Sequence, residues 1–237
     1  MKKLLLISNS TNPGEAYLGW PLPFIQEFID KYKLKTLAFI PFAGVTISWD
    51  DYFKRVQDVF AAMGVEVLAV HRAEDPIQMV QQADAVAVGG GNTFHLVYWL
   101  HQLGLMEVIR REAEAGKPYM GWSAGSNVAC PSLKTTNDMP ITEPASFNCM
   151  GLIPFQINPH YLDAHPSGHG GETREQRIEE FLVANPEMYV AGLREATLLE
   201  LEDGKLHLKG RSALRLFKHA QAPQELVPGS DLNFLLK

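Results

Sequence analysis

Short apolar runs alternate with amphipathic stretches through the first half of the chain, and this alternation constrains the fold most strongly. The expected strands are residues 4–8, 34–41, 65–70, 85–88 and a short apolar segment ending at 120. The expected helices are residues 50–63, 76–82, 93–103 and 106–115. Strands that alternate with helices imply right-handed crossovers, so we expect a parallel sheet covered on both faces.

The last third of the chain has a different pattern. Residues 172–184 have helical spacing, whereas residues 198–201 and 206–208 flank an Asp-Gly pair and predict a β-hairpin. Residues 214–218 predict a further strand. Because repeats and linker-like segments are lacking, we predict one α/β domain over residues 1–237, with a mostly parallel, doubly wound sheet and a C-terminal β-hairpin.

Charge and cysteine content exclude several classes of protein. The net charge is −6 and no run of Lys or Arg occurs, which argues against nucleic acid or a membrane surface as a partner. Cys130 and Cys149 are too few for a disulfide framework, and we expect both to be buried apolar residues. The apolar run at residues 1–7 is too short for a signal peptide. We expect a cytoplasmic protein that is a monomer or a small homo-oligomer.

Residues 121–125 read Gly-Trp-Ser-Ala-Gly and follow the fifth expected strand. This G-x-S-x-G pattern is typical of a nucleophile elbow, a sharp strand-to-helix turn that exposes the central serine. The two glycines would let backbone approach backbone closely. An ordinary Gly/Ser turn is the alternative. On the first reading, Ser123 is a catalytic nucleophile.

The fourth expected strand runs into Gly89-Gly90-Gly91-Asn92, and its end would lie at the same edge of the sheet as Ser123. Exposed backbone N–H groups here could cradle a phosphate or form half of an oxyanion hole. The spacing fits neither a dinucleotide fingerprint nor a Walker loop. We therefore expect an oxyanion hole formed by Gly90 or Gly91 together with Ala124, the residue after the nucleophile.

A serine nucleophile needs a general base, and His160 is the best candidate of eight histidines. It ends the apolar segment 155–160, which as a strand would deliver it to the same sheet edge. A metal site of His160, His165 and His169 is an alternative, but no neighbouring Cys or H-E-x-x-H pattern supports it.

Two carboxylates are candidates for the residue that orients the base. Asp138 lies in the polar loop 134–140, soon after the expected nucleophile helix, and Glu195 ends another expected strand. A solvated loop carboxylate would be the default interpretation of either. The pattern alone does not choose between them.

These segments resemble peptidase E, the α-aspartyl dipeptidase family of serine peptidases. The resemblance spans about residues 4 to 195 and is carried by seven ordered blocks: Ser8–Thr11, Phe39–Thr46, Val88–Phe94, Gly121–Gly125, Thr135–Ile141, Gln156–His160 and Gly171–Arg177. It implies a fold similar to class I glutamine amidotransferases, with serine as the nucleophile. It implies hydrolysis of Asp-X dipeptides, small peptides that begin with aspartate, without metal or cofactor.

The matching positions make Ser123 the nucleophile and His160 the base. They favour Asp138 as the third member, with Glu195 as its rival. Arg174 matches a position whose guanidinium would pair with the β-carboxylate of the substrate.

A structural alternative for Arg174, one further substrate role and two other functions stay open. Arg174 could instead pair with Glu172 or Glu175 on a helix surface, and Asn92 could donate a further hydrogen bond to the substrate. The alternatives to an Asp-X dipeptidase are a cyanophycinase-like hydrolase of β-aspartyl bonds and a catalytically silent binding protein. The presence of the serine, the histidine and the glycines argues against the silent protein.

Overall fold

The computed structural model describes residues 1–163, 168 and 170–237, and its larger sheet has seven strands in the order β3-β2-β4-β5-β1-β8-β9. The first five of these are parallel, and β8 pairs antiparallel with both β1 and β9. Their bounds are β1 (Leu4–Ile7), β2 (Thr36–Ile40), β3 (Glu66–Ala69), β4 (Ala85–Val88), β5 (Tyr119–Trp122), β8 (Thr197–Glu202) and β9 (Lys205–Gly210). The predicted fold class is confirmed, and the hairpin β8–β9 extends the parallel sheet.

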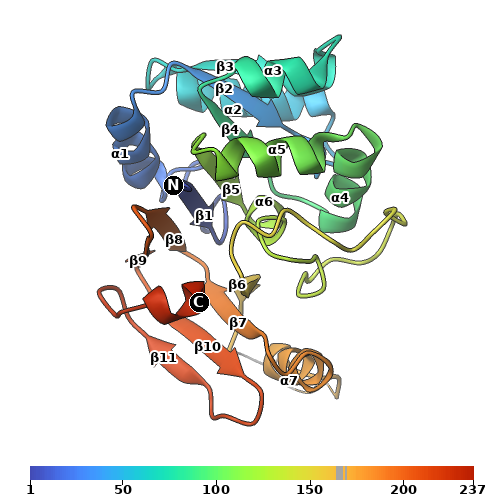
Figure 1. Cartoon of the computed structure of the whole chain (residues 1–237), viewed down its shortest axis with the longest axis vertical. Coiled ribbons are helices and arrows are strands. Elements are labelled where there is room, and N and C mark those ends of the chain that lie inside the picture. The colour runs from blue at the N-terminus through green and yellow to red at the C-terminus, as the bar shows by residue number, and fades with distance from the viewer. Residues whose placement is uncertain (164–167, 169) are drawn as a thin grey trace.

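Helices cover both faces of this sheet (Figure 1). Side chains alternate along each strand, so that Leu5 and Ile7 pack with α1 and α2, whereas Leu4 and Leu6 pack with α3 to α6. The bounds are α1 (Leu22–Tyr32), α2 (Trp49–Ala61), α3 (Pro76–Gln82), α4 (Thr93–Gln102), α5 (Leu105–Glu114), α6 (Ala124–Asn127) and α7 (Arg174–Ala184), with 3₁₀ turns at Val70–Arg72 and Asn233–Leu236.

Helix α1 was not among the predicted helices, because its first turn is rich in proline. Pro21 is the N-cap residue and a second proline follows at the start of the helix. Proline is tolerated there, since the first N–H groups of a helix have no partner within it. The buried face of α1 is formed by Ile25, Phe28 and Ile29.

A smaller, four-stranded sheet has the order β11-β10-β7-β6. It consists of β6 (Gln156–Tyr161), β7 (Tyr189–Arg194), β10 (Leu214–Lys218) and β11 (Gln224–Leu226). The expectation that the strand bearing His160 would join the parallel sheet is therefore wrong. The reason is that β1 already pairs with β5 on one side and with β8 on the other. Strand β6 pairs instead with β7, in parallel.

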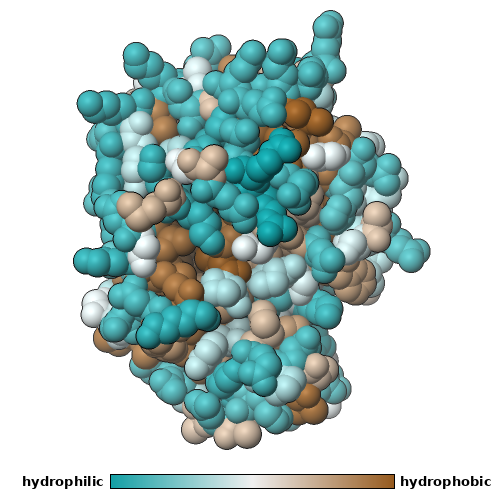
Figure 2. All heavy atoms as spheres, in the orientation of Figure 1, coloured by the Kyte–Doolittle hydropathy of each residue, from teal (hydrophilic) through white to brown (hydrophobic). Residues whose placement is uncertain are grey.

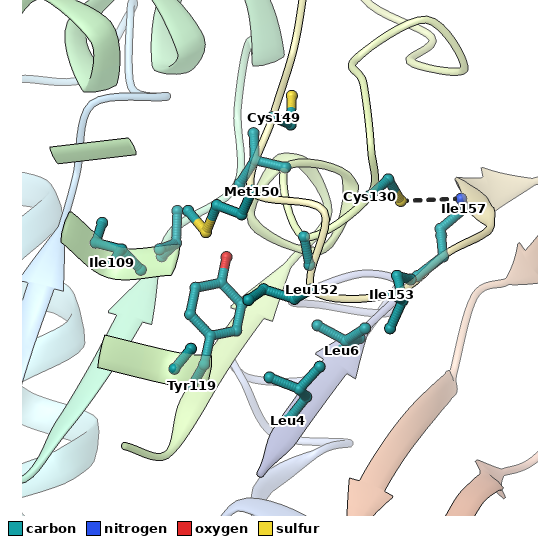
Figure 3. Close-up of a cluster of buried hydrophobic side chains, with 14 of the residues drawn as sticks. Leu4, Leu6, Ile109, Tyr119, Cys130, Cys149, Met150, Leu152, Ile153 and Ile157 are labelled. Carbon is teal, nitrogen blue, oxygen red and sulfur yellow. Dashed lines mark hydrogen bonds between the residues drawn. The ribbon is translucent and has the colours of Figure 1, made fainter. Parts of the chain in front are cut away.

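Figure 3 shows the apolar cluster that links the nucleophile region to the segment leading into β6. Cys130 and Cys149 are buried there, as predicted, and burial raises the pKa of the Cys130 thiol to about 12. The sulfur of Cys130 accepts a hydrogen bond from the Ile157 N–H at 3.1 Å. Neither thiol is suited to act as a nucleophile, and both serve packing.

The outer surface is mostly hydrophilic on the face drawn in Figure 2, with hydrophobic residues gathered near the middle of the view. Among the described residues, no helix is long and apolar enough to cross a membrane. Two of the three histidines of the alternative metal site, His165 and His169, lie outside the described residues.

Candidate active site

Ser123 stands in the sharp turn between β5 and α6, with φ 55° and ψ −113°. This backbone conformation is strained for a residue with a side chain, and surrounding contacts must hold it. The flanking glycines allow those contacts. A Cβ on Gly125 would lie 2.0 Å from the Val88 carbonyl oxygen, and one on Gly121 would lie 2.4 Å from the Gly125 oxygen. The predicted close backbone approach at both glycines is confirmed.

Ser123, His160 and Glu195 form a continuous hydrogen-bonded series. The Oγ of Ser123 lies 3.0 Å from Nε2 of His160, and Nδ1 of His160 lies 2.7 Å from Oε1 of Glu195. A carboxylate can only accept, so Nδ1 carries the proton and Nε2 is left to accept from the serine hydroxyl. This is the arrangement that a serine nucleophile requires of its base and of the group that orients the base.

The preference for Asp138 as the partner of His160 is wrong, because its carboxylate binds elsewhere. One oxygen of Asp138 accepts from the Thr93 N–H at 2.7 Å, from the Thr93 hydroxyl at 2.6 Å and from the Thr136 hydroxyl at 3.0 Å. Thr93 is the first residue of α4, where a negative charge is favourable. The rival candidate, Glu195, occupies the place beside His160.

Glu195 lies at the point where the chain passes from β7 in the small sheet to β8 in the large one. Two polar side chains at the end of β1 hold this junction. The Ser8 hydroxyl donates to the Leu193 carbonyl at 2.7 Å and accepts from the His160 N–H at 3.0 Å. Asn9 Oδ1 accepts from the N–H that follows Glu195 at 2.8 Å.

Ser8 and Asn9 were not predicted as site residues. The sequence feature that could have identified them is their position in the chain. They follow a strand that pairs with β5 in parallel, and this strand therefore ends beside Ser123.

The glycine loop after β4 lies against Ser123. A Cβ on Gly90 would lie 2.9 Å from that of Ser123, and Gly91 has φ 137°, a conformation open to glycine. The Tyr52 hydroxyl, which accepts from the Trp122 indole at 3.0 Å, donates to the Gly90 carbonyl at 3.0 Å. Sequence reasoning did not single out Tyr52.

Within the described part of the chain, the N–H groups of Gly90, Gly91 and Ala124 make no hydrogen bond. These are the three groups expected to form an oxyanion hole, and they are available to a ligand.

Two cavities meet at Ser123 and His160. The smaller, about 170 Å³, is also lined by Thr136, Asp138 and Arg174. The larger, about 650 Å³, is lined on its other sides by apolar residues and by segments of the Gly-rich loop and α2. A scissile bond placed at Ser123 would therefore have a small polar space on one side and a larger, less polar one on the other.

Arg174 is the cation of the smaller cavity. The described residues give it no ion pair, because Glu175 pairs with Arg215 at 2.9 Å and Glu172 with Arg177 at 3.9 Å. The alternative that Arg174 pairs with Glu172 or Glu175 is therefore wrong. Burial, reinforced by the nearby positive charge of Arg177, lowers the pKa of Arg174, and Asp138 opposes the shift.

Asn92 lines the larger cavity, not the smaller one. Its Oδ1 accepts from the His95 N–H at 3.0 Å as the N-cap of α4, and its Nδ2 donates to the Met139 carbonyl at 2.9 Å. The side chain is thus engaged in holding the loop, which accounts for asparagine here without a substrate contact.

A family model described as peptidase family S51 matches residues 4–209. The chain belongs to peptidase family S51. Its relatives include peptidase E of Nostoc sp., which is 51% identical over 100% of this chain and 97% of its own length. Peptidase E of Pasteurella multocida is 45% identical over 92% of this chain and 93% of its own. The predicted resemblance to peptidase E is confirmed.

Two solved structures have a similar fold. A protein of Listeria monocytogenes EGD-e that was solved as a candidate peptidase E has a TM-score of 0.65 and 24% identity, covering 90% of this chain and all of its own. A peptidase from an acI-B1 actinobacterium has a TM-score of 0.70 and 17% identity, covering 98% of this chain and 96% of its own. At these identities the likeness concerns the fold alone.

Proposed function

We propose that this S51 peptidase is a serine dipeptidase that hydrolyses Asp-X through an acyl-enzyme on Ser123. The observation that carries the proposal is the smaller cavity, in which Arg174 and Asp138 stand beside the nucleophile. An N-terminal aspartate carries an ammonium group and a β-carboxylate. The cavity offers a group of opposite charge for each, Asp138 for the ammonium and Arg174 for the carboxylate. A residue with only one of these charges would leave a partner in the cavity unpaired.

The serine hydroxyl would attack the carbonyl carbon of the aspartyl residue while its proton passes to Nε2 of His160. The carbonyl oxygen becomes an oxyanion, which the N–H groups of Ala124 and of Gly90 or Gly91 would stabilise. Glu195 would stabilise the imidazolium through Nδ1. His160 then gives its proton to the leaving amine as the peptide bond breaks, and water hydrolyses the aspartyl ester by the same route.

Asp138 gains a different role from the one predicted for it. All three hydrogen bonds of its carboxylate are made through Oδ2, which leaves Oδ1 without a donor among the described residues. The carboxylate lines the same cavity as Ser123 and Arg174. We assign it to the α-ammonium group of the substrate, while the guanidinium of Arg174 binds the β-carboxylate.

The test is hydrolysis of Asp-Leu compared with Asn-Leu, Glu-Leu, Ala-Leu and β-Asp-Leu. Asn-Leu has the shape of Asp-Leu without its side-chain charge, and we expect kcat/KM to fall on the order of 10²-fold or more for it. Ser123→Ala should lower kcat on Asp-Leu on the order of 10³-fold or more. Activity of Ser123→Ala equal to that of the wild type would rule out the serine mechanism. Preference for β-Asp-Leu would establish a cyanophycinase-like β-aspartyl hydrolase instead.

Arg174 has a matched control one helical turn away. Arg174→Met should lower kcat/KM for Asp-Leu about 100-fold and reduce the discrimination against Asn-Leu. Arg177→Met removes a charge from the same helix at a residue outside the smaller cavity, and it should preserve the ratio of Asp-Leu to Asn-Leu. An unchanged ratio in Arg174→Met would remove this residue from substrate recognition.

The proposed setting is the cytoplasm. It is supported by the two buried cysteines, which are free thiols of the kind that a reducing compartment preserves.

A further inference from the structure

The larger cavity carries a cation that the proposed chemistry has not yet used. Arg55, on α2, lines this cavity together with Ser123 and His160. Its guanidinium lies over the ring of Tyr17 at 5.5 Å from the ring centre. The aromatic face fixes the side chain against the cavity wall and leaves the edge of the guanidinium, with its N–H groups, for another partner.

The described residues provide Arg55 with no carboxylate within ion-pair distance. The nearest acidic side chains in the sequence are engaged elsewhere, since Asp58 pairs with Lys54 and Asp51 hydrogen-bonds to the Ser48 hydroxyl. Arg55 is exposed. The cavity therefore holds an uncompensated positive charge.

The ring of Tyr17, which lines the same cavity, supports this guanidinium. The Tyr17 hydroxyl is buried close to that of Tyr52 and is not open to a ligand. The exposed guanidinium is thus the charged donor on this wall. A carboxylate is the ligand that pairs with it through two N–H groups.

We propose that Arg55 binds the C-terminal carboxylate of the dipeptide and so restricts this enzyme to dipeptides. The inference rests on the proposed function, which places the aspartyl residue in the smaller cavity. The second residue must then enter the larger one, and its terminal carboxylate lies one residue, at most about 3.6 Å of chain, beyond the scissile bond. The apolar lining from Val45, Ile47 and Ile141 accommodates varied side chains at that second residue.

The experiment compares Asp-Leu with its amide, Asp-Leu-NH₂, and with Asp-Leu-Leu. The wild-type enzyme should prefer Asp-Leu, because only this substrate places a carboxylate at Arg55. Arg55→Met should lower kcat/KM for Asp-Leu about 10- to 100-fold, mainly through KM, and leave that for the amide unchanged. Arg55→Lys should retain most of the preference. Lys54→Met, at an adjacent residue outside the cavity, should match the wild type.

Equal cleavage of Asp-Leu and its amide by the wild type would overturn the proposal, as would an equal loss on both substrates in Arg55→Met. Binding gives an independent readout. Titration of Ser123→Ala with Asp-Leu should show binding that is lost in the double variant that also carries Arg55→Met. Equal affinities of these two variants for Asp-Leu would also overturn the proposal. Failure of the proposed function is distinguishable. It would show as equal cleavage of Asp-Leu and Ala-Leu, whereas Arg55 is tested by acid against amide for either peptide.

Discussion

Ser123 stands on the seven-stranded sheet, whereas His160 comes from the four-stranded sheet and Glu195 from the junction between the two. The proposed nucleophile is held by backbone packing, in which glycines at 121 and 125 allow carbonyl groups to approach closely. The proposed base, His160, and its partner Glu195 are held by side-chain hydrogen bonds from Ser8 and Asn9, across more than 150 residues of sequence.

We call Ser123 with its flanking glycines the nucleophile half of the site, and His160 with Glu195 the base half; the two halves should respond differently to substitution. Backbone packing fails by steric overlap, so a change in the nucleophile half should cost stability of the whole fold. Side-chain hydrogen bonds between strand ends position groups without carrying the core. A change in the base half should therefore cost catalysis more than stability.

The largest effect expected within this comparison concerns the two carboxylates. Glu195→Gln preserves shape but gives His160 a neutral partner, and kcat on Asp-Leu should fall on the order of 10³-fold with little change in melting temperature. Asp138→Asn should instead act mainly through KM, because we assign Asp138 to the substrate ammonium group. Steady-state kinetics of both variants test the assignment. It would be reversed if kcat fell in Asp138→Asn and did not fall in Glu195→Gln.

The contrast also explains what the sequence could predict. The alternating strands and helices of residues 36–122 and the glycines around Ser123 are local patterns, because strand period and close backbone approach depend on neighbouring residues. The partner of His160 is not local. Asp138 and Glu195 are both loop carboxylates near strand or helix ends, and only the three-dimensional path of β6 and β7 separates them. The second sheet was missed for the same reason, since strand pairing is a long-range property.

Gly125→Ala tests the nucleophile half. A Cβ at this position would lie 2.0 Å from the backbone oxygen of Val88, which cannot move without disturbing β4. We expect a loss of about 2–4 kcal/mol in the free energy of unfolding, or failure to fold. Gly170→Ala is the control, because a Cβ there meets none of the described residues within 4 Å and should change stability by less than about 0.5 kcal/mol. Chemical denaturation of both variants measures the difference, and equal stabilities would contradict the steric account of the elbow.

Thr173→Ala tests whether the start of α7 positions Arg174, and its expected effect is smaller. Thr173 caps α7 by accepting from the Gln176 N–H at 3.1 Å, and Arg174 is the first residue of that helix. Loss of the cap should cost about 1 kcal/mol and raise KM for Asp-Leu by fraying the turn that carries Arg174. Asp75→Ala removes the comparable cap of α3, which lies outside both cavities, and should cost similar stability without the change in KM. Equal KM values in the two variants would show that the helix start does not position Arg174.

The smallest effect concerns the ion pairs that Arg194, at the end of β7, makes with an acid after β6 and an acid on β11. Arg194, directly before Glu195, binds Asp163 at 2.7 Å and Glu225 at 2.7 Å, and these contacts lower the pKa of both carboxyls. The unfolded chain therefore binds more protons than the folded one. The stabilisation is complete above the unfolded pKa of about 4 and is lost as pH falls through the lower folded pKa. Because both acids are partly exposed, Asp163→Asn should cost less than about 1 kcal/mol at neutral pH. Melting temperature measured from pH 7 to pH 3 should fall less steeply in Asp163→Asn than in the wild type, and parallel curves would show that this pair contributes nothing to the junction beside Glu195.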